Sequence, residues 1–222
     1  MPWFTHDAVE FFRELELNNE KTWFEANKKR YEESVKKPLE SFVAQLIDRY
    51  REFEPGIVLH PKDCVFRIYK DVRFSKDKTP YKTSAGAVVS QGGRKGKGHP
   101  GIYFHFDPRR LAVASGYYEV EPDDLLKFRK HISANLNEFQ KLLDDSVFKK
   151  HFKGIEGEKN KIIPQEFRAA AEKQPYLFNK QFYYWGERKP EDITRKDLDD
   201  LVVEYYRAAR PMNAFLAKAL TP

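Results

Sequence analysis

Residues 102–116 read IYFHFDPRRLAVASG, and this stretch decides the fold class. Apolar residues alternate there with Tyr103 and His105, which is the period of a strand that has one face toward a core. A turn sequence at 107–110 follows, and residues 111–116 form a second apolar run. Because the connection is so short, the sequence predicts two neighbouring antiparallel strands.

Similar patterns on either side of this stretch predict further elements. Additional strands are expected at 64–68, 83–90 and 181–185. Helical spacing predicts helices at residues 5–17, through Trp23, Phe24 and Tyr31, at residues 38–50 and, in one or two pieces, at residues 121–143. An irregular stretch is expected from there to Pro164, followed by a short helix. The last helix is expected at residues 198–219, with a kink or break at Pro211. Since helices precede and follow the strands, we expect an α+β fold with a central antiparallel sheet of about four to five strands flanked by N- and C-terminal helices. Without repeats or linkers, residues 1–222 are predicted to form a single domain.

The composition is that of a folded protein with a core of its own. The chain has 222 residues, of which 41% are hydrophobic and 33% are charged. Cys64 is the only cysteine, so no internal disulfide can form and a reducing compartment is expected. The N-terminus does not resemble a signal peptide, and no apolar run approaches the ~20 residues of a membrane helix. We therefore expect a soluble cytoplasmic protein that does not associate with membranes.

The positive charge is concentrated in one segment. The net charge is +6, and residues 62–98 contain ten Lys or Arg residues but only three Asp residues. The rest of the chain carries 30 basic and 31 acidic residues. If the segment folds onto one surface, it forms a basic patch that attracts anions.

The most polar part of this segment is residues 66–83, FRIYKDVRFSKDKTPYKT. Arginine side chains such as Arg67 and Arg73 can form bidentate bonds to a phosphate or carboxylate, and lysines can add point charges. Phe74 and Tyr81 could stack on a base or another ring. The alternative is structural: the sequence from Asp77 to Pro80 is common in turns, and Arg67 could pair with Asp63 or Asp71.

This run closely resembles the signature of a family of bacterial and fungal proteins designated domain of unknown function 2461. The matching residues are Phe66-Arg67-Ile68, Asp71, Arg73 through Thr83, Asn18-Asn19 followed by Trp23-Phe24, Tyr31 with Pro38, and the C-terminal helix. Lys70 stands where arginine is commoner in the family, which argues against a bidentate contact at that place. The resemblance covers nearly the whole chain and supplies no catalytic residues. A signature rich in charge nevertheless favours ligand binding as much as a structural role.

Other motifs carry less information. The glycine-rich loop at 92–101 has His99-Pro100 where a phosphate-binding loop needs Lys and Ser or Thr, so we expect a flexible hairpin loop whose basic residues could close over an anion. The histidines are scattered, and only His105 has a second type of metal ligand, Asp107, close by in sequence. No metal site and no cofactor are expected. Cys64 lies on the apolar face of its predicted strand and is expected to be inert.

The sequence thus predicts an anion site in the strand–loop region. The candidate ligand-binding residues are Arg67, Lys70, Asp71, Arg73, Lys76, Lys78, Tyr81, Lys82, Tyr103 and His105. The expected function is binding of a phosphate-bearing or other anionic ligand, either a phosphorylated small molecule or a nucleic acid. The first alternative is a hydrolase or transferase acting on a phosphorylated small molecule, for which Tyr69, Asp71, Tyr103 and His105 could share one face with Arg67. The second is a purely structural signature. The sequence alone does not decide whether the protein is an enzyme.

Overall fold

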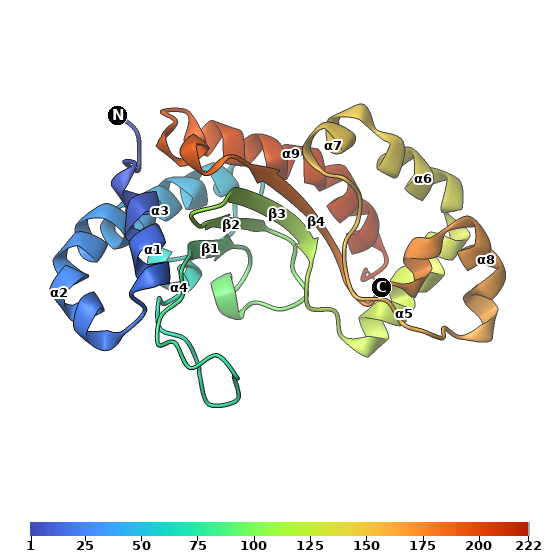
Figure 1. Ribbon diagram of the computed structural model, residues 1–222. Coiled ribbons are helices and arrows are strands. Elements are labelled where there is room, and N and C mark those ends of the chain that lie inside the picture. The colour runs from blue at the N-terminus through green and yellow to red at the C-terminus, as the bar shows by residue number, and fades with distance from the viewer. Residues whose placement is uncertain (222) are drawn as a thin grey trace. The chain divides into compact units, whose positions relative to one another are not determined.

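The computed structural model describes residues 1–221 and confirms the predicted α+β fold (Figure 1). Its four strands form one sheet in the order β1-β2-β3-β4. The strands are β1 (Ala85–Val89), β2 (Ile102–Phe106), β3 (Leu111–Tyr117) and β4 (Phe182–Arg188). β1 and β2 are antiparallel, with Ala85 opposite Phe106 and Val89 opposite Ile102. The strands predicted at 83–90, 102–106, 111–116 and 181–185 are therefore confirmed.

Helices occur before and after the strands in the chain. The α-helices are α1 (Asp7–Leu17), α2 (Lys21–Tyr31), α3 (Lys37–Arg51), α4 (Pro61–Cys64), α5 (Pro122–Ala134), α6 (Leu136–Asp144), α7 (Ser146–His151), α8 (Arg168–Lys173) and α9 (Leu198–Lys218). A π-helical turn, η1 (Glu32–Lys36), joins α2 to α3, and short 3₁₀ turns are η2 (Gly93–Lys95), η3 (Gln165–Phe167), η4 (Pro175–Phe178) and η5 (Pro190–Thr194). Within the part of the chain that the structure describes, no helix has the length and apolarity needed to cross a membrane.

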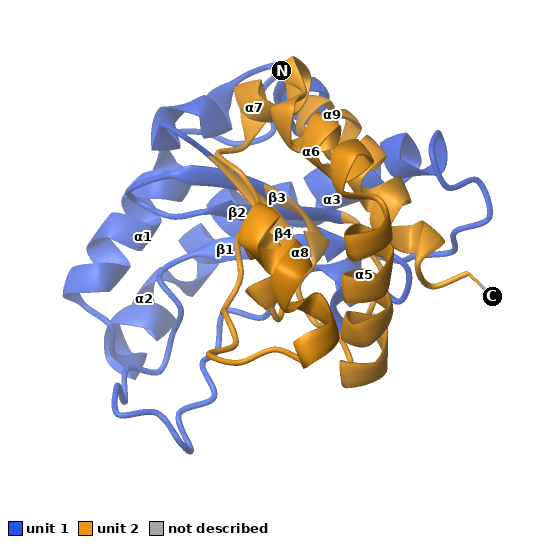
Figure 2. Ribbon diagram, turned by 90° about the vertical axis from the view of Figure 1, so that its right-hand side faces the viewer, with its two compact units in different colours: residues 1–95, 102–113, 187–203 blue, residues 96–101, 114–186, 204–222 orange. Residues whose placement is uncertain are grey.

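The chain forms two compact units, each assembled from three separate segments (Figure 2). Unit 1 comprises residues 1–95, 102–113 and 187–203, and unit 2 comprises residues 96–101, 114–186 and those from 204 onward. Strands β3 and β4 and helix α9 contribute residues to both units. The expectation of a single domain stays a prediction.

The core of unit 1 lies against one face of β2. Phe104 and Phe106 on that face are fully buried. The ring centroid of Phe42, on α3, is 4.8 Å from that of Phe104, and the centroid of Phe12, on α1, is 5.7 Å from that of Phe106. Because side chains alternate along a strand, the opposite face of β2 carries the polar residues of the predicted site.

In unit 2, helix α5 packs on the sheet through Phe128, whose ring centroid is 5.6 Å from that of Phe182 on β4. A buried polar chain lies beside α9: the Tyr184 hydroxyl donates to Asn213, and the Asn213 amide donates to Ser115, each over 3.0 Å. These bonds satisfy polar groups that would otherwise be costly to bury.

The strand predicted at 64–68 is wrong. Pro61 begins the short helix α4, which ends at Cys64, because proline fits the first position of a helix without loss of a hydrogen bond. The chain then runs extended and touches its neighbour only at two isolated bridges, Val65 with Ala87 and Tyr69 with Tyr81. The alternation of side chains is therefore real, but it belongs to an extended arm rather than to a strand of the sheet.

Two further expectations need correction. Helix α9 continues through Pro211, so the predicted break does not occur, while a kink there stays a prediction. The apolar residues before and after the proline, such as Ala209 and Met212, are buried, and this packing outweighs the loss of one backbone hydrogen bond. The stretch expected to be irregular contains helix α7, which begins with a side-chain cap: Asp145 accepts a hydrogen bond of 2.8 Å from the Phe148 amide. A helix this short shows no clear periodicity.

Candidate functional site

The family signature folds as an irregular hairpin, residues 65–87, which we call the signature hairpin. It has two extended arms, residues 65–70 and 80–87, and a loop, residues 71–79, that projects from the rest of unit 1 (Figure 1). Backbone hydrogen bonds join the arms: the Lys82 amide donates to the Ile68 carbonyl over 2.7 Å, and the Lys70 amide donates to the Pro80 carbonyl over 2.9 Å. The charged residues of the signature therefore lie on one supersecondary unit.

Asn19 anchors the base of the hairpin. Its side-chain amide donates to the Tyr81 carbonyl over 2.9 Å, and its side-chain oxygen accepts from the Tyr81 amide over 3.1 Å. The Tyr81 ring is only 3% exposed and stacks on Phe24 of α2 at a centroid distance of 4.0 Å. Tyr81, which the sequence suggested as a ligand-binding residue, thus belongs to the core of unit 1, and we leave it out of the site.

The loop of the hairpin neutralises most of its own charge. Arg73 makes two hydrogen bonds to Asp71, of 2.9 and 2.6 Å, and its side chain, followed by its backbone amide, lowers the pKa of Asp71 to about 2. The Lys70 ammonium group lies 2.7 Å from an Asp77 carboxylate oxygen, and hydrogen bonds from Lys70 and Thr79 lower the pKa of Asp77 well below its usual value. These residues stabilise the loop, as the structural interpretation predicts.

The remaining loop residues make few contacts. The Lys78 ammonium group donates to the backbone carbonyl of Val72 over 2.9 Å, so it also holds the loop together. Lys76 is exposed and makes no hydrogen bond or ion pair with any described residue. Phe74 is 95% exposed, with the Arg73 guanidinium 5.9 Å from its ring centroid. Nothing in the structure brings Lys76 or Lys78 next to the cations of the arms.

Besides Lys70, which is bonded to Asp77, the arms carry the cations Arg67 and Lys82, and the charge of Arg67 acts on Lys82. Neither side chain makes a hydrogen bond or an ion pair within residues 1–221. Lys82 is half-buried, and burial, followed by the charge of Arg67, lowers the pKa of Lys82. Arg67 also lowers the pKa of Asp71 slightly, but Arg73 already occupies both oxygens of that carboxylate. The arms thus hold two neighbouring, uncompensated positive charges.

The Phe66 ring connects these cations to the polar face of β2. The Lys82 ammonium group lies 5.3 Å from the centroid of the Phe66 ring, and the centroid of the Tyr103 ring lies 6.3 Å from the same point. The Tyr103 hydroxyl is 3.2 Å from Nδ1 of His105, and Nε2 of His105 is 3.0 Å from the Asp107 carboxylate. Arg67, Lys82, Tyr103 and His105 therefore lie in one region of unit 1.

The matched region of the family covers all of these residues. The family model described as "Conserved hypothetical protein (DUF2461)" matches residues 7–215 of the 222-residue chain. The chain belongs to this family. No curated protein and no solved structure matches it significantly.

Two residues, Asn19 and Asp107, have roles that are not visible in the sequence. Asn19 is part of the Asn18-Asn19 pair, but its partner Tyr81 is 62 positions away, so only the structure shows the clamp. Asp107 was noted only for its closeness to His105, yet it also accepts the backbone amides of Arg109 (2.7 Å) and Arg110 (3.0 Å) and so fixes the turn between β2 and β3. An Asp-Pro pair directly after a strand is the signal that predicts such a turn.

The basic residues of the glycine-rich loop are also engaged in contacts. Arg94 donates to the carbonyls of Lys62 and Val65, the latter over 3.0 Å, and so holds the end of α4. Gly93 has a φ of +59°, and a Cβ there would lie 2.6 Å from the Asp63 carbonyl oxygen, so only glycine fits. Among the described residues, no cluster of three His, Cys, Asp or Glu side chains could hold a metal ion.

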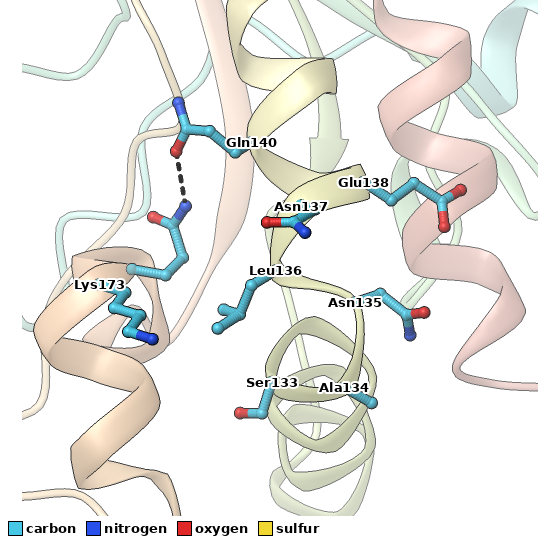
Figure 3. A pocket seen from close by; sticks show the side chains of 9 residues that line it. Ser133, Ala134, Asn135, Leu136, Asn137, Glu138, Gln140 and Lys173 are labelled. Carbon is cyan, nitrogen blue, oxygen red and sulfur yellow. Dashed lines mark hydrogen bonds between the residues drawn. The ribbon is translucent and has the colours of Figure 1, made fainter.

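Unit 2 contains a separate open hollow of about 600 Å³ at the junction of α5 and α6, facing α8 (Figure 3). Gln174 donates to Gln140 across it over 3.2 Å, and Lys173 and Glu138 bring opposite charges to its lining. The Ser133 hydroxyl is buried at this hollow and has no hydrogen-bond partner among the described residues. None of the residues predicted from the sequence to bind a ligand lines it.

Proposed function

We propose that the protein binds a phosphate-bearing or other anionic ligand through Arg67 and Lys82. The supporting observation is that these two cations repel each other and that neither forms an ion pair with a described carboxylate, whereas Lys70 and Arg73 in the same hairpin do. Lys82 is half-buried, whereas Arg67 is exposed. A half-buried lysine charge without a carboxylate partner costs stability and is therefore typical of a binding site. An anion bound between the two side chains would remove the repulsion and restore the pKa of Lys82 toward its ordinary value.

The small number of available cations favours a phosphorylated small molecule over a nucleic acid. With two phosphate contacts, the logarithm of the binding constant should fall with the logarithm of the salt concentration with a slope of about −1.4 to −1.8. Raising salt from 50 to 200 mM would then weaken nucleic-acid binding only roughly tenfold. About four phosphate contacts would give roughly 10²-fold weakening, but Lys70, Arg73 and Lys78 are bonded within the hairpin. A steep salt dependence measured with single-stranded DNA would contradict the two-cation site.

Isothermal titration calorimetry with inorganic phosphate and pyrophosphate tests the proposal directly. A hydrogen bond to a charged group contributes about 1.5–3 kcal/mol, so Arg67→Gln and Lys82→Gln should each weaken binding by about 10- to 150-fold. Lys76→Gln is the matched control, because it removes one exposed lysine charge from the same hairpin and should change the affinity less than about twofold. Equal losses in all three variants, or no binding of either anion by the wild type, would refute the proposal.

The alternative of an enzyme is favoured by one specific observation, the hydrogen-bonded chain from Tyr103 to Asp107, which is developed below. The structural alternative accounts well for the loop of the hairpin and for Tyr81, but not for Arg67 and Lys82. We also propose that the protein resides in a reducing compartment, the cytoplasm, where its single cysteine needs no partner.

A further inference from the structure

Three side chains on the polar face of β2 form a continuous hydrogen-bonded chain. Tyr103 and His105 are two residues apart on β2 and so lie on one side of it, and Asp107 follows directly after the strand, at the start of the turn. The hydrogen-bonded chain contains a hydroxyl, an imidazole and a carboxylate, joined over 3.2 and 3.0 Å. This is the order of groups that activates a hydroxyl in many hydrolytic enzymes.

The positions of the protons follow from the partners of Asp107. Burial alone would raise the pKa of this carboxyl group, but hydrogen bonds from His105 and from the amides of Arg109 and Arg110 outweigh it and lower the pKa. An ionised carboxylate only accepts hydrogen bonds, so Nε2 of His105 carries the proton that points to it. In the neutral imidazole Nδ1 is then an acceptor, and the Tyr103 hydroxyl donates to it.

The turn between β2 and β3 does not require the other two residues. Oδ1 of Asp107 makes both bonds to the turn amides, whereas Oδ2 is the oxygen that orients His105. On the neighbouring strand the residue opposite His105 is Gly86; a Cβ there would lie 2.8 Å from the Phe104 carbonyl oxygen, so the close backbone requires glycine, and 3.7 Å from the His105 Cβ. Glycine thus leaves the His105 side chain without a side-chain neighbour at the opposite position of β1.

We propose that Tyr103, His105 and Asp107 form a proton relay that hydrolyses a phosphate ester held by Arg67 and Lys82. The inference rests on the proposed anion site, which the Phe66 ring connects to Tyr103. In this relay Tyr103 is the catalytic residue, because its hydroxyl is the end of the hydrogen-bonded chain and would take the proton of the attacking water. His105 and Asp107 are positioning residues that act through it.

The reaction needs only water as co-reactant. A water molecule gives a proton to the Tyr103 oxygen while the hydroxyl proton of Tyr103 moves to Nδ1 of His105, and the water oxygen forms a bond to phosphorus. The bond from phosphorus to the ester oxygen breaks, and that oxygen takes up the proton that His105 returns through Tyr103. Asp107 stabilises the imidazolium that exists between these events, and Arg67 and Lys82 offset the negative charge on the phosphoryl oxygens.

p-Nitrophenyl phosphate, a monoester, and bis(p-nitrophenyl) phosphate, a diester, distinguish the substrate class and test the relay. The wild type should hydrolyse one of them, and Tyr103→Phe should lower kcat by roughly 10²- to 10⁴-fold with little change in KM. Binding of inorganic phosphate should stay within about twofold of the wild type, since the phenyl ring still packs on Phe66. Tyr118→Phe is the matched control, because the Tyr118 ring contacts Tyr183 in unit 2 and the loss of its hydroxyl should leave kcat unchanged.

Two further results separate a relay from a structural hydrogen bond. His105→Ala should lose activity to a similar extent, and added imidazole should restore part of it. The double variant Tyr103→Phe/His105→Ala should be no slower than either single variant, because groups that act as a unit are not additive.

The proposal is overturned if the wild type hydrolyses neither ester, or if Tyr103→Phe retains its kcat. These failures differ from failure of the anion site. A protein that binds phosphate through Arg67 and Lys82 but hydrolyses neither ester would keep the proposed function and lose only the relay.

Discussion

Asn19 provides the sharpest test of how the signature hairpin is held. Its side chain makes both a donor and an acceptor bond to the backbone of Tyr81, in a partly buried place. Asn19→Ala removes both bonds and leaves the Tyr81 amide and carbonyl without these partners. Each such bond contributes about 0.5–1.5 kcal/mol, so we expect a loss of about 2 kcal/mol in the free energy of unfolding. For a chain of this size that corresponds to a fall of roughly 4–8 °C in Tm.

The assay is urea unfolding followed by tryptophan fluorescence, combined with hydrogen exchange of the Tyr81 amide. Asn18→Ala is the matched control, because Asn18 makes one exposed side-chain bond, to the Glu14 carbonyl, and should cost at most about 0.5 kcal/mol. Asn19→Asp should fall in between, since it keeps the acceptor for the Tyr81 amide but places a carboxylate oxygen against the Tyr81 carbonyl. An Asn19→Ala variant as stable as the control, with unchanged exchange at Tyr81, would refute the clamp.

Three other properties can be checked with single substitutions. Lys82→Met should raise Tm near neutral pH, because the pKa of Lys82 is lowered in the folded state. The unfolded chain binds more protons between this lowered pKa and the ordinary value of 10.5, so the stability of the wild type should rise with pH in that range. The variant should not show this rise. Arg30→Met should destabilise unit 1 by about 1–3 kcal/mol, since Arg30 bonds to both Asp7 and Glu14. Because Arg30 lowers the pKa of Asp7, the stability that this pair contributes is present above pH 3.8 and is lost on acidification. The urea midpoint should therefore fall less steeply from pH 6 to pH 3 in the variant than in the wild type. Burial, followed by the charge of Asp63, raises the pKa of the Cys64 thiol to about 11, so iodoacetamide should label it at pH 8 only in urea, and labelling of the native protein at the rate of a free thiol would contradict the buried position.

The parts of the fold that the sequence predicts are those in which local pattern and burial agree. β2 alternates because one face meets α1 and α3, and its bounds are those expected from Ile102 to Phe106. The segment at 64–68 has the same alternation, yet it touches its neighbour only at isolated bridges. Nothing in its sequence distinguishes an extended arm from a paired strand, since both place side chains alternately. Pro211 likewise follows a local rule that tertiary packing overrides.

The candidate site was harder to predict, because charge pairing in a loop depends on its conformation. Six cations in the signature are equivalent by composition, but Asp77 can reach Lys70 only because the loop folds back on itself. The same turn chemistry places Asp71 against Arg73. Arg67 and Lys82 form no ion pair, although Lys70 on the same arm as Arg67 reaches Asp77, so composition alone does not tell which cations are paired.

The anion hypothesis depends on Arg67 and Lys82 having no ion-pair partner while other cations of the hairpin have one. A hairpin selected only for stability would gain from a carboxylate near Arg67 and Lys82, as its own loop shows with Asp71 and Asp77. Evolution commonly retains a destabilising arrangement where function needs it. Removing the charge of Lys82 should therefore both stabilise the fold and weaken binding, whereas the same substitution of a purely structural lysine would destabilise the protein. The two measurements on one variant thus decide between the functional and the structural interpretation of the signature.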